Sequence, residues 1–109
     1  MWFFTPDGFY SIVQKLGHDN LTVRSRVASD LDILREKFMP TLSVTVEGAG
    51  TDYPFRATIG HAAFAEGLAW IGHDIHYDNF KNEVAKVKGP SRAMVYGDVW
   101  QALIGLEHS

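Results

Sequence analysis

Hydrophobic and polar residues alternate along several segments of the first sixty residues, a period of two that predicts β-strands. The alternation is strict over residues 21–27, LTVRSRV, where Thr22, Arg24 and Arg26 share one face. Residues 9–15, FYSIVQK, are rich in aromatic and β-branched side chains and predict a second strand. Because only a short polar loop separates the two segments, we expect a β-hairpin.

The same pattern returns further along the chain and predicts a second hairpin. Residues 42–47, LSVTVE, and 53–59, YPFRATI, both alternate. We expect Val44 and Val46 to face inward in the first segment and Arg56 to face outward in the second. The intervening turn, Gly48 to Asp52, is rich in glycine but lacks the lysine and serine of a phosphate-binding loop. A hairpin turn is therefore the better interpretation.

Apolar residues spaced by three and four predict helices after each hairpin. We expect the first helix to begin at Ser29 as N-cap and to end before Pro40, and the second to cover residues 61–72. Their buried stripes are expected to consist of Leu31, Leu34 and Phe38, and of Phe64, Leu68 and Ile71.

The last third of the chain also predicts helices. Asp78 is the expected N-cap of a short helix, and Gly89 is its expected stop. Pro90 suits the first turn of a final helix, in which Ala93, Tyr96, Trp100 and Leu103 share one face. Close helix packing would explain the glycines in or beside these and the preceding helices, which are Gly67, Gly72, Gly97 and Gly105.

These elements predict an α+β protein with one domain over residues 1–109. The expected architecture is a four-stranded antiparallel sheet in the order ββαββα, a ferredoxin-like or related two-layer sandwich, with extra helices at the C-terminus. A chain of 109 residues with 46% hydrophobic and 21% charged residues suits one compact fold.

The amino-acid composition limits the kinds of partner that we expect this chain to bind. The net charge is −3, and a nucleic-acid-binding protein is usually basic, so composition disfavours a nucleic-acid partner. No run approaches 18 apolar residues, and the N-terminus lacks the basic region of a signal peptide, so no membrane partner is expected. The chain has no cysteine, which mildly favours the cytoplasm.

The segment from Gly72 to Lys81, GHDIHYDNFK, crowds ionisable residues between two predicted helices. His73 and His76 could bind a metal with His61, but His61 lies twelve residues before His73, more than three helical turns away. We therefore expect neither a metal nor another cofactor. An acid–base role for His73 or His76, oriented by Asp74, remains an alternative.

The outward face of the sheet is the stronger candidate for a site. Arg24, Arg26 and Arg56 are expected to point the same way, and three guanidinium groups suit a phosphate or carboxylate. If the segment between the helices lies beside this face, it would add the tentative ligand-binding residues Tyr77, Asn79 and Lys81. Two alternatives stay open, an ordinary solvated face with acidic counter-charges and a face covered by the C-terminal helices.

Five aromatic residues within the first ten leave an apolar surplus. Alternate residues of a strand point to opposite faces, so these side chains cannot all be buried in one place. Two explanations of this surplus stay open: the aromatic residues form a homodimer contact, or they pack under the C-terminal helices. A basic run from Asp78 to Arg92 is typical of a solvated helix face. A nucleic-acid surface would need aromatic residues beside basic ones on an exposed sheet, and Tyr10 could supply one.

Several blocks of the sequence, WFFTPDGFYSIVQK, LTVRSRVASDLDILR, GTDYPFR, DIHYDNFK and RAMVYGDVW, occur in this order along most of the chain. In these blocks the chain resembles a family of small, uncharacterised bacterial proteins of about this length. The resemblance implies a bacterial or phage-borne intracellular protein with a single full-length domain. It implies no activity, substrate or catalytic residue.

The leading hypothesis is a non-enzymatic binding or regulatory module that recognises an anionic ligand or protein partner through the arginine-bearing face. One alternative is a small enzyme acting on a phosphorylated or nucleotide-like substrate. Another is a phage-related inhibitor or adaptor that binds a protein through the aromatic N-terminus.

Overall fold

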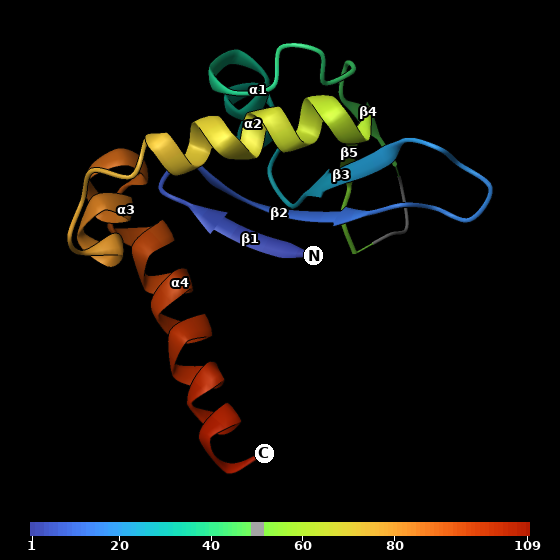
Figure 1. Cartoon of the computed structure of the whole chain (residues 1–109). Helices are drawn as coiled ribbons and strands as arrows, with labels where there is room; N and C mark the ends of the chain where they lie inside the picture. Colours follow the sequence, from blue (N-terminus) through green and yellow to red (C-terminus); the bar gives the residue numbers. More distant parts are fainter. Residues whose placement is uncertain (49–51) are drawn as a thin grey trace. The chain divides into compact units, whose positions relative to one another are not determined.

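The computed structural model describes residues 1–48 and 52–109, and Figure 1 shows the chain. The centre of the predicted glycine-rich turn, residues 49–51, lies outside the described residues. The described residues form two compact units, Met1–His76 (unit 1) and Tyr77–Ser109 (unit 2). Each unit is described by itself, and a single domain over the whole chain stays a prediction.

Unit 1 confirms the α+β class and the antiparallel sheet. Its sheet has five strands over the described residues, not the four that were predicted. They run in the spatial order β1-β2-β3-β5-β4, with every neighbouring pair antiparallel. Their bounds are β1 Trp2–Thr5, β2 Gly8–Val13, β3 Leu21–Ser25, β4 Val46–Glu47 and β5 Phe55–Ile59.

The additional strand, β1, changes the predicted topology. It pairs with β2 across the turn at Pro6 and Asp7, with Trp2 opposite Ser11. The described elements therefore begin with three strands before the first helix, so the ferredoxin-like ββαββα order is not matched.

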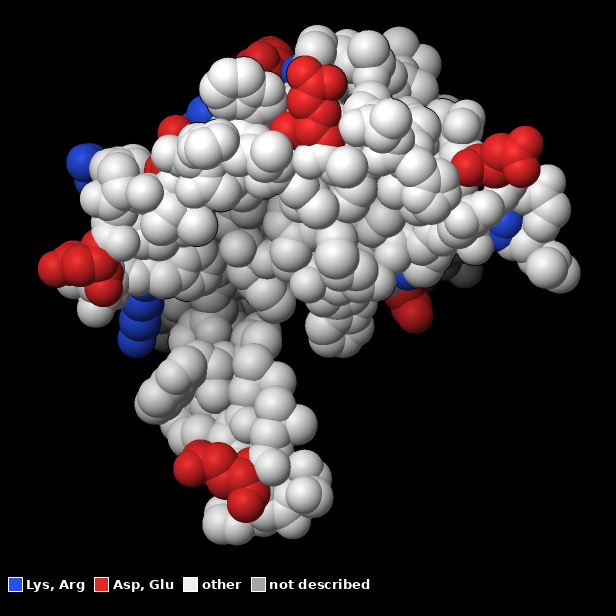
Figure 2. Space-filling view, viewed as in Figure 1, with Lys and Arg blue, Asp and Glu red and all other residues white. Residues whose placement is uncertain are grey.

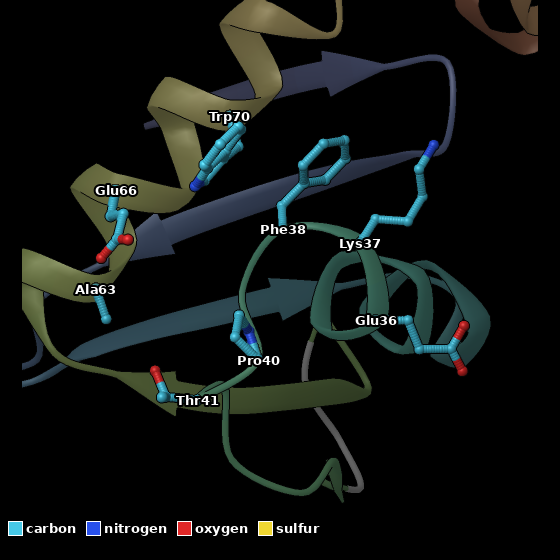
Figure 3. A pocket seen from close by; sticks show the side chains of 8 residues that line it. All are labelled: Glu36, Lys37, Phe38, Pro40, Thr41, Ala63, Glu66 and Trp70. Carbon is cyan, nitrogen blue, oxygen red and sulfur yellow. The ribbon is translucent and has the colours of Figure 1, made fainter.

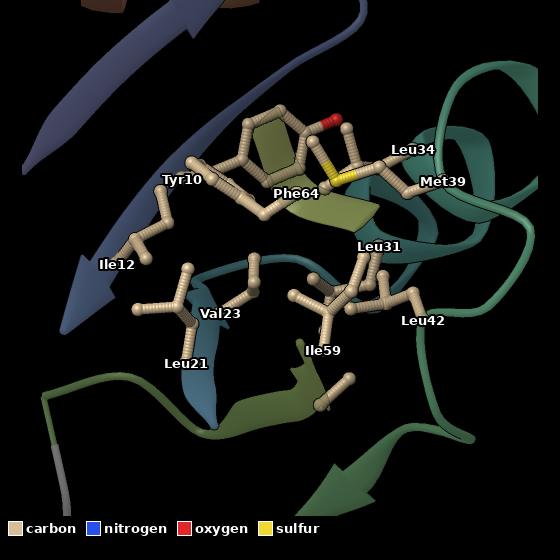
Figure 4. Packing of buried hydrophobic residues seen from close by; sticks show 11 residues of the cluster. Tyr10, Ile12, Leu21, Val23, Leu31, Leu34, Met39, Leu42, Ile59 and Phe64 are labelled. Carbon is tan, nitrogen blue, oxygen red and sulfur yellow. The ribbon is translucent and has the colours of Figure 1, made fainter. Parts of the chain in front are cut away.

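Two helices, α1 (Ala28–Lys37) and α2 (His61–His73), lie on the same side of the sheet in Figure 1. Figure 4 shows the core between these layers, in which Val23, Leu31 and Leu34 are fully buried. The predicted inward residues of β3 and β5 and the stripes of both helices contribute to this core. Tyr10 also belongs to it, so the suggestion that Tyr10 supplies an aromatic ring on an exposed sheet face is wrong.

The segment before β4 is not the strand that its alternation predicted. Val44 and Val46, expected inward, are 79% and 57% exposed. Arg35 of α1 donates from Nε to the main-chain oxygen of Ser43 at 3.1 Å and from Nη2 to Thr45 Oγ1 at 3.0 Å. The Ser43 main-chain oxygen thus binds an arginine side chain, whereas the Ser43 main-chain N–H donates to the Thr58 main-chain oxygen of β5 at 2.9 Å.

The first helix starts one residue before the predicted Ser29 cap. Val27 is its N-cap, and no side chain caps it there. Asp30 in the first turn is 2% exposed, and its carboxylate accepts a hydrogen bond from the Phe9 main-chain N–H at 3.1 Å. The Tyr10 hydroxyl donates to the Asp30 main-chain oxygen at 2.8 Å. These two bonds fasten α1 to β2.

Gly67 is the interior glycine that close packing explains. A Cβ built there would lie 2.5 Å from Met39 Cγ and 3.1 Å from the Phe38 main-chain oxygen. Nothing in the described residues lies within 4 Å of a Cβ built at Gly72 or Gly105, so the packing interpretation is wrong for those two.

Unit 2 consists of α3 (Phe80–Lys88), α4 (Pro90–Leu103) and a short 3-10 helix, η1 (Ile104–His108). Gly89 turns the chain between α3 and α4 with φ of 97°, a left-handed value that glycine adopts without strain. It ends α3 as predicted, and Pro90 opens α4.

One detail of unit 2 corrects the prediction. The N-cap of α3 is Asn79 rather than Asp78, because Asn79 Oδ1 accepts from the Asn82 main-chain N–H at 2.9 Å. The four residues expected on one face of α4 differ in exposure: Ala93 and Tyr96 are buried, whereas Trp100 and Leu103 are 67% and 53% exposed.

Candidate ligand-binding site

Strand register places Ser11, Arg24 and Arg56 in one row across β2, β3 and β5. Ser11 is the cross-strand partner of Arg24, and Arg24 is the partner of Arg56. Directly opposite side chains start about 4.5–5.5 Å apart at Cβ, and like charges in such a pair destabilise the sheet. A binding site for a negative group would account for this pairing.

Arg24 is held in a defined position in this row. Its Nη2 donates to Ser11 Oγ at 2.7 Å, and its guanidinium carbon lies 4.7 Å from the centre of the Tyr53 ring. Its Nε is buried and has no hydrogen-bond partner among the described residues. An unsatisfied buried donor costs about 1–3 kcal/mol, a cost that an acceptor supplied by a ligand would remove.

Arg26 and Arg56 also contact Tyr53. The Arg26 guanidinium carbon lies 4.9 Å from the centre of the Tyr53 ring, so Arg24 and Arg26 both form cation–π contacts with this one ring. Arg56 Nη2 donates to the Tyr53 main-chain oxygen at 3.5 Å. Neither Arg24 nor Arg26 forms an ion pair with a carboxylate of the described residues.

These arginines line an open cavity of about 480 Å³, here called the arginine pocket. Its lining residues are Trp2, Lys15, Arg24, Arg26, Asp52, Tyr53 and Arg56. Four cations and one carboxylate give it a balance of +3, although the whole chain carries −3. Positive charge is therefore concentrated at this pocket.

The helix-bearing side of unit 1 carries charges of both signs. In the view of Figure 2, acidic side chains are the more prominent over α1 and α2, with smaller areas of lysine or arginine beside them. By strand alternation, Arg24 and Arg56 belong to the opposite face of the sheet from the core residues Val23 and Ala57.

A second cavity of unit 1, of about 300 Å³, lies between the end of α1 and α2 (Figure 3). Its lysine, Lys37, donates to the Asp7 carboxylate at 2.8 Å and lies 4.0 Å from that of Asp74. The hydrogen bond to Asp7 raises the pKa of Lys37 above its usual 10.5, against the opposing effect of partial burial. Because Lys37 already serves two carboxylates, this cavity is the weaker candidate for an anion.

The three histidines considered as possible metal ligands or bases lie in separate local environments. His61 Nε2 is 3.0 Å from Gln14 Oε1, and His76 Nδ1 is 2.8 Å from the main-chain oxygen of Asp74. His73 contacts the Trp70 ring at 6.1 Å between centres. Within the described residues, no group of three or more histidines and carboxylates has a geometry that could hold a metal ion.

The six predicted ligand-binding residues divide between the units. Arg24, Arg26 and Arg56 come together in the arginine pocket, whereas Tyr77, Asn79 and Lys81 belong to unit 2.

In unit 2 the three residues have local roles. Asn79 caps α3, the Tyr77 ring contacts that of Phe80 at 6.0 Å between centres, and the Lys81 amine approaches Gly97. That they share a site with the arginines stays a prediction.

Four lining residues were missed at the level of sequence: Trp2, Lys15, Asp52 and Tyr53. The place of Trp2 could have been predicted if the apolar run of residues 2–4 had been paired, across the Pro6-Asp7-Gly8 turn, with the strand that follows. Tyr53 has the parity of the inward residues of β5, but it precedes Pro54 and lies outside the strand. Alternation therefore does not determine where its ring points.

Comparison with family models, curated proteins and solved structures gives no match for this chain. The resemblance to a bacterial family thus stays an expectation. No helix in the described ranges has the length and apolar character that crossing a bilayer requires.

Proposed function

We propose that this protein is a binding module that recognises an anionic ligand through the arginine pocket. The observation that carries the proposal is the direct cross-strand pairing of Arg24 with Arg56 beside a buried, unsatisfied Arg24 Nε. An anion between the two guanidinium groups would screen their repulsion and accept the unused hydrogen bond.

The surroundings favour a phosphoryl group as the anion. Guanidinium groups present several donors in a fixed plane and bind phosphate or carboxylate through paired hydrogen bonds. Four cations around one cavity suit a group that carries more than one negative charge. Ser11 and Tyr53 orient Arg24 before binding, which lowers the entropic cost of forming the complex.

The enzymatic alternative has less support from this pocket. Its proposed bases, His73 and His76, do not line the arginine pocket. None of the contacts described above favours the enzymatic alternative.

The proposal is tested by calorimetric titration of the whole chain with inorganic phosphate and with ribose 5-phosphate. We expect R24A/R56A to weaken binding at least tenfold, because charged hydrogen bonds contribute about 1.5–3 kcal/mol each. Arg24→Lys keeps the charge but loses the paired geometry, so its binding should be intermediate. Lys86→Ala, which removes an exposed charge outside the pocket, is the control.

Two results would contradict the proposal. One is the absence of binding of either phosphate compound to the unaltered chain at millimolar concentration. The other is undiminished binding by a folded R24A/R56A variant, with folding checked by circular dichroism.

A further inference from the structure

We infer that the ligand of the arginine pocket is a free mononucleotide, whose phosphate binds Arg24 and Arg56 and whose base stacks on Trp2. The inference rests on the proposed anion-binding function. It adds a second recognition element, because the same cavity contains an exposed aromatic ring as well as the arginines.

Trp2 continues the row that contains the arginines. It is the cross-strand partner of Ser11, which pairs with Arg24, which pairs with Arg56. The four residues thus lie on four neighbouring strands and on one face of the sheet. Strands are about 4.8 Å apart, so the backbones at Trp2 and Arg24 are separated by roughly 10 Å. The sugar of a nucleotide and the length of the arginine side chain can bridge that separation.

The Trp2 side chain is both oriented and accessible. Its ring meets the Phe9 ring edge-on, with centres 5.8 Å apart and planes at 87°. Phe9 is itself stacked on Phe4 at 4.5 Å, so two rings support the tryptophan. Trp2 is nevertheless 66% exposed. Covering an exposed aromatic ring with another flat ring is favourable, and any of the nucleobases can stack on a tryptophan in this way.

Asp52 gives a further reason to prefer a nucleotide to a simple anion. Its carboxylate lines the same cavity and would repel inorganic phosphate. A nucleotide carries ribose hydroxyls and, in most bases, amino groups that donate hydrogen bonds to such a carboxylate. In Rossmann-type dinucleotide sites, for example, an acidic residue binds the ribose hydroxyls.

The overall charge favours a free nucleotide over a nucleic-acid strand. The chain carries −3, and the basic character is confined to one cavity. A polyanion gains affinity from many phosphate contacts along an extended basic surface, whereas a single nucleotide needs one. A net negative chain also repels a long polyanion at a distance.

The test compares AMP, GMP, CMP and UMP with ribose 5-phosphate in calorimetric titrations of the full chain. At least one mononucleotide should bind about tenfold or more tightly than ribose 5-phosphate, from stacking of its base. Trp2→Leu should remove that preference while leaving ribose 5-phosphate binding in place. Trp70→Leu, which makes the same change at an exposed tryptophan outside the pocket, is the matched control.

Fluorescence provides a second measurement that does not depend on altering Trp2. The chain has three tryptophans, so W70F/W100F leaves Trp2 as the sole tryptophan emitter. Its emission should be quenched by a bound mononucleotide and not by ribose 5-phosphate.

The outcomes separate this inference from the proposed function. If ribose 5-phosphate binds as tightly as every mononucleotide, and binding depends on Arg24, the anion site stands and the nucleotide inference is overturned. If no phosphate compound binds, both are overturned. If a single-stranded oligonucleotide binds more tightly than any mononucleotide, the free nucleotide is the wrong ligand.

Discussion

Lys37 forms ion pairs that link α1 to the β1–β2 turn and to the end of α2. From the last turn of α1 it binds Asp7, in the turn between β1 and β2, and lies near Asp74 at the end of α2. The hydrogen bond from Lys37 to Asp7 holds the pKa of Lys37 above its ordinary value. Its stabilising contribution is therefore complete below pH 10.5 and is lost as the pH rises through the folded-state pKa.

We expect Lys37→Met to lower the free energy of unfolding at pH 7 by about 0.5–1 kcal/mol. The estimate is that of an exposed ion pair, because the Lys37 side chain is 45% exposed and solvent screens it. Urea denaturation at neutral pH and well above 10.5 should show the difference shrinking at the higher pH.

Asp7→Asn provides the control for that experiment. In the Asp7→Asn background, Lys37→Met should have little effect at either pH, since the main partner is already neutral. An effect of Lys37→Met that is the same at both pH values would show that packing, not charge, explains it.

At the scale of elements, the sequence predicted those strands whose two faces differ in polarity. Strands β3 and β5 follow their alternation because one face is buried under helices, and β2 was predicted from its aromatic and β-branched residues. The short strand β1 was missed because Trp2, Phe3 and Phe4 are all apolar and show no alternation. The strand predicted over residues 42–47 was too long, since β4 covers only Val46–Glu47 and the Ser43 main-chain oxygen binds Arg35 instead of a strand.

The candidate site was likewise predicted only where its residues lie in alternating strands. Alternation is sufficient to place Arg24 and Arg56 on one face, because each lies within a regular strand. It cannot reveal Trp2 or Asp52, which come from an unrecognised strand and from a turn. The apolar run of β1 shows no alternation, and Asp52 lies outside the strands, so a period of two cannot place either side chain.

Helix α3 offers a prediction about capping. Asn79 Oδ1 accepts a hydrogen bond from the Asn82 N–H, and Asp78 forms no side-chain cap there. Asn79→Ala should weaken the helix by about 1 kcal/mol, since it removes that bond. Asp78→Ala should have almost no effect. Amide hydrogen exchange should show faster exchange at Asn82 in the first variant alone.

Asn79→Asp completes this set of variants. Aspartate is also a good N-cap, so protection of the Asn82 amide should be retained. Equal loss of protection in the Asp78 and Asn79 alanine variants would contradict the assignment of the cap.

At the scale of the whole molecule, the core and the arginine pocket both belong to unit 1. The core cluster and the hydrophobic residues packed on it lie between Phe3 and Ile71. Every residue that lines the arginine pocket falls between Trp2 and Arg56. Neither feature uses a side chain of unit 2, which begins at Tyr77.

We therefore expect a chain of residues 1–76 to fold and to bind phosphate compounds as the full chain does. Seventy-six residues with a continuous core exceed the size, about 40 residues, below which domains usually need staples. Circular dichroism should retain the strand signal, and urea unfolding should remain cooperative with a smaller m value, because less surface is exposed on unfolding. An unfolded 1–76 chain would show that unit 1 requires Tyr77–Ser109. A folded chain that binds ribose 5-phosphate more weakly would instead give unit 2, with Tyr77, Asn79 and Lys81, a part in the site.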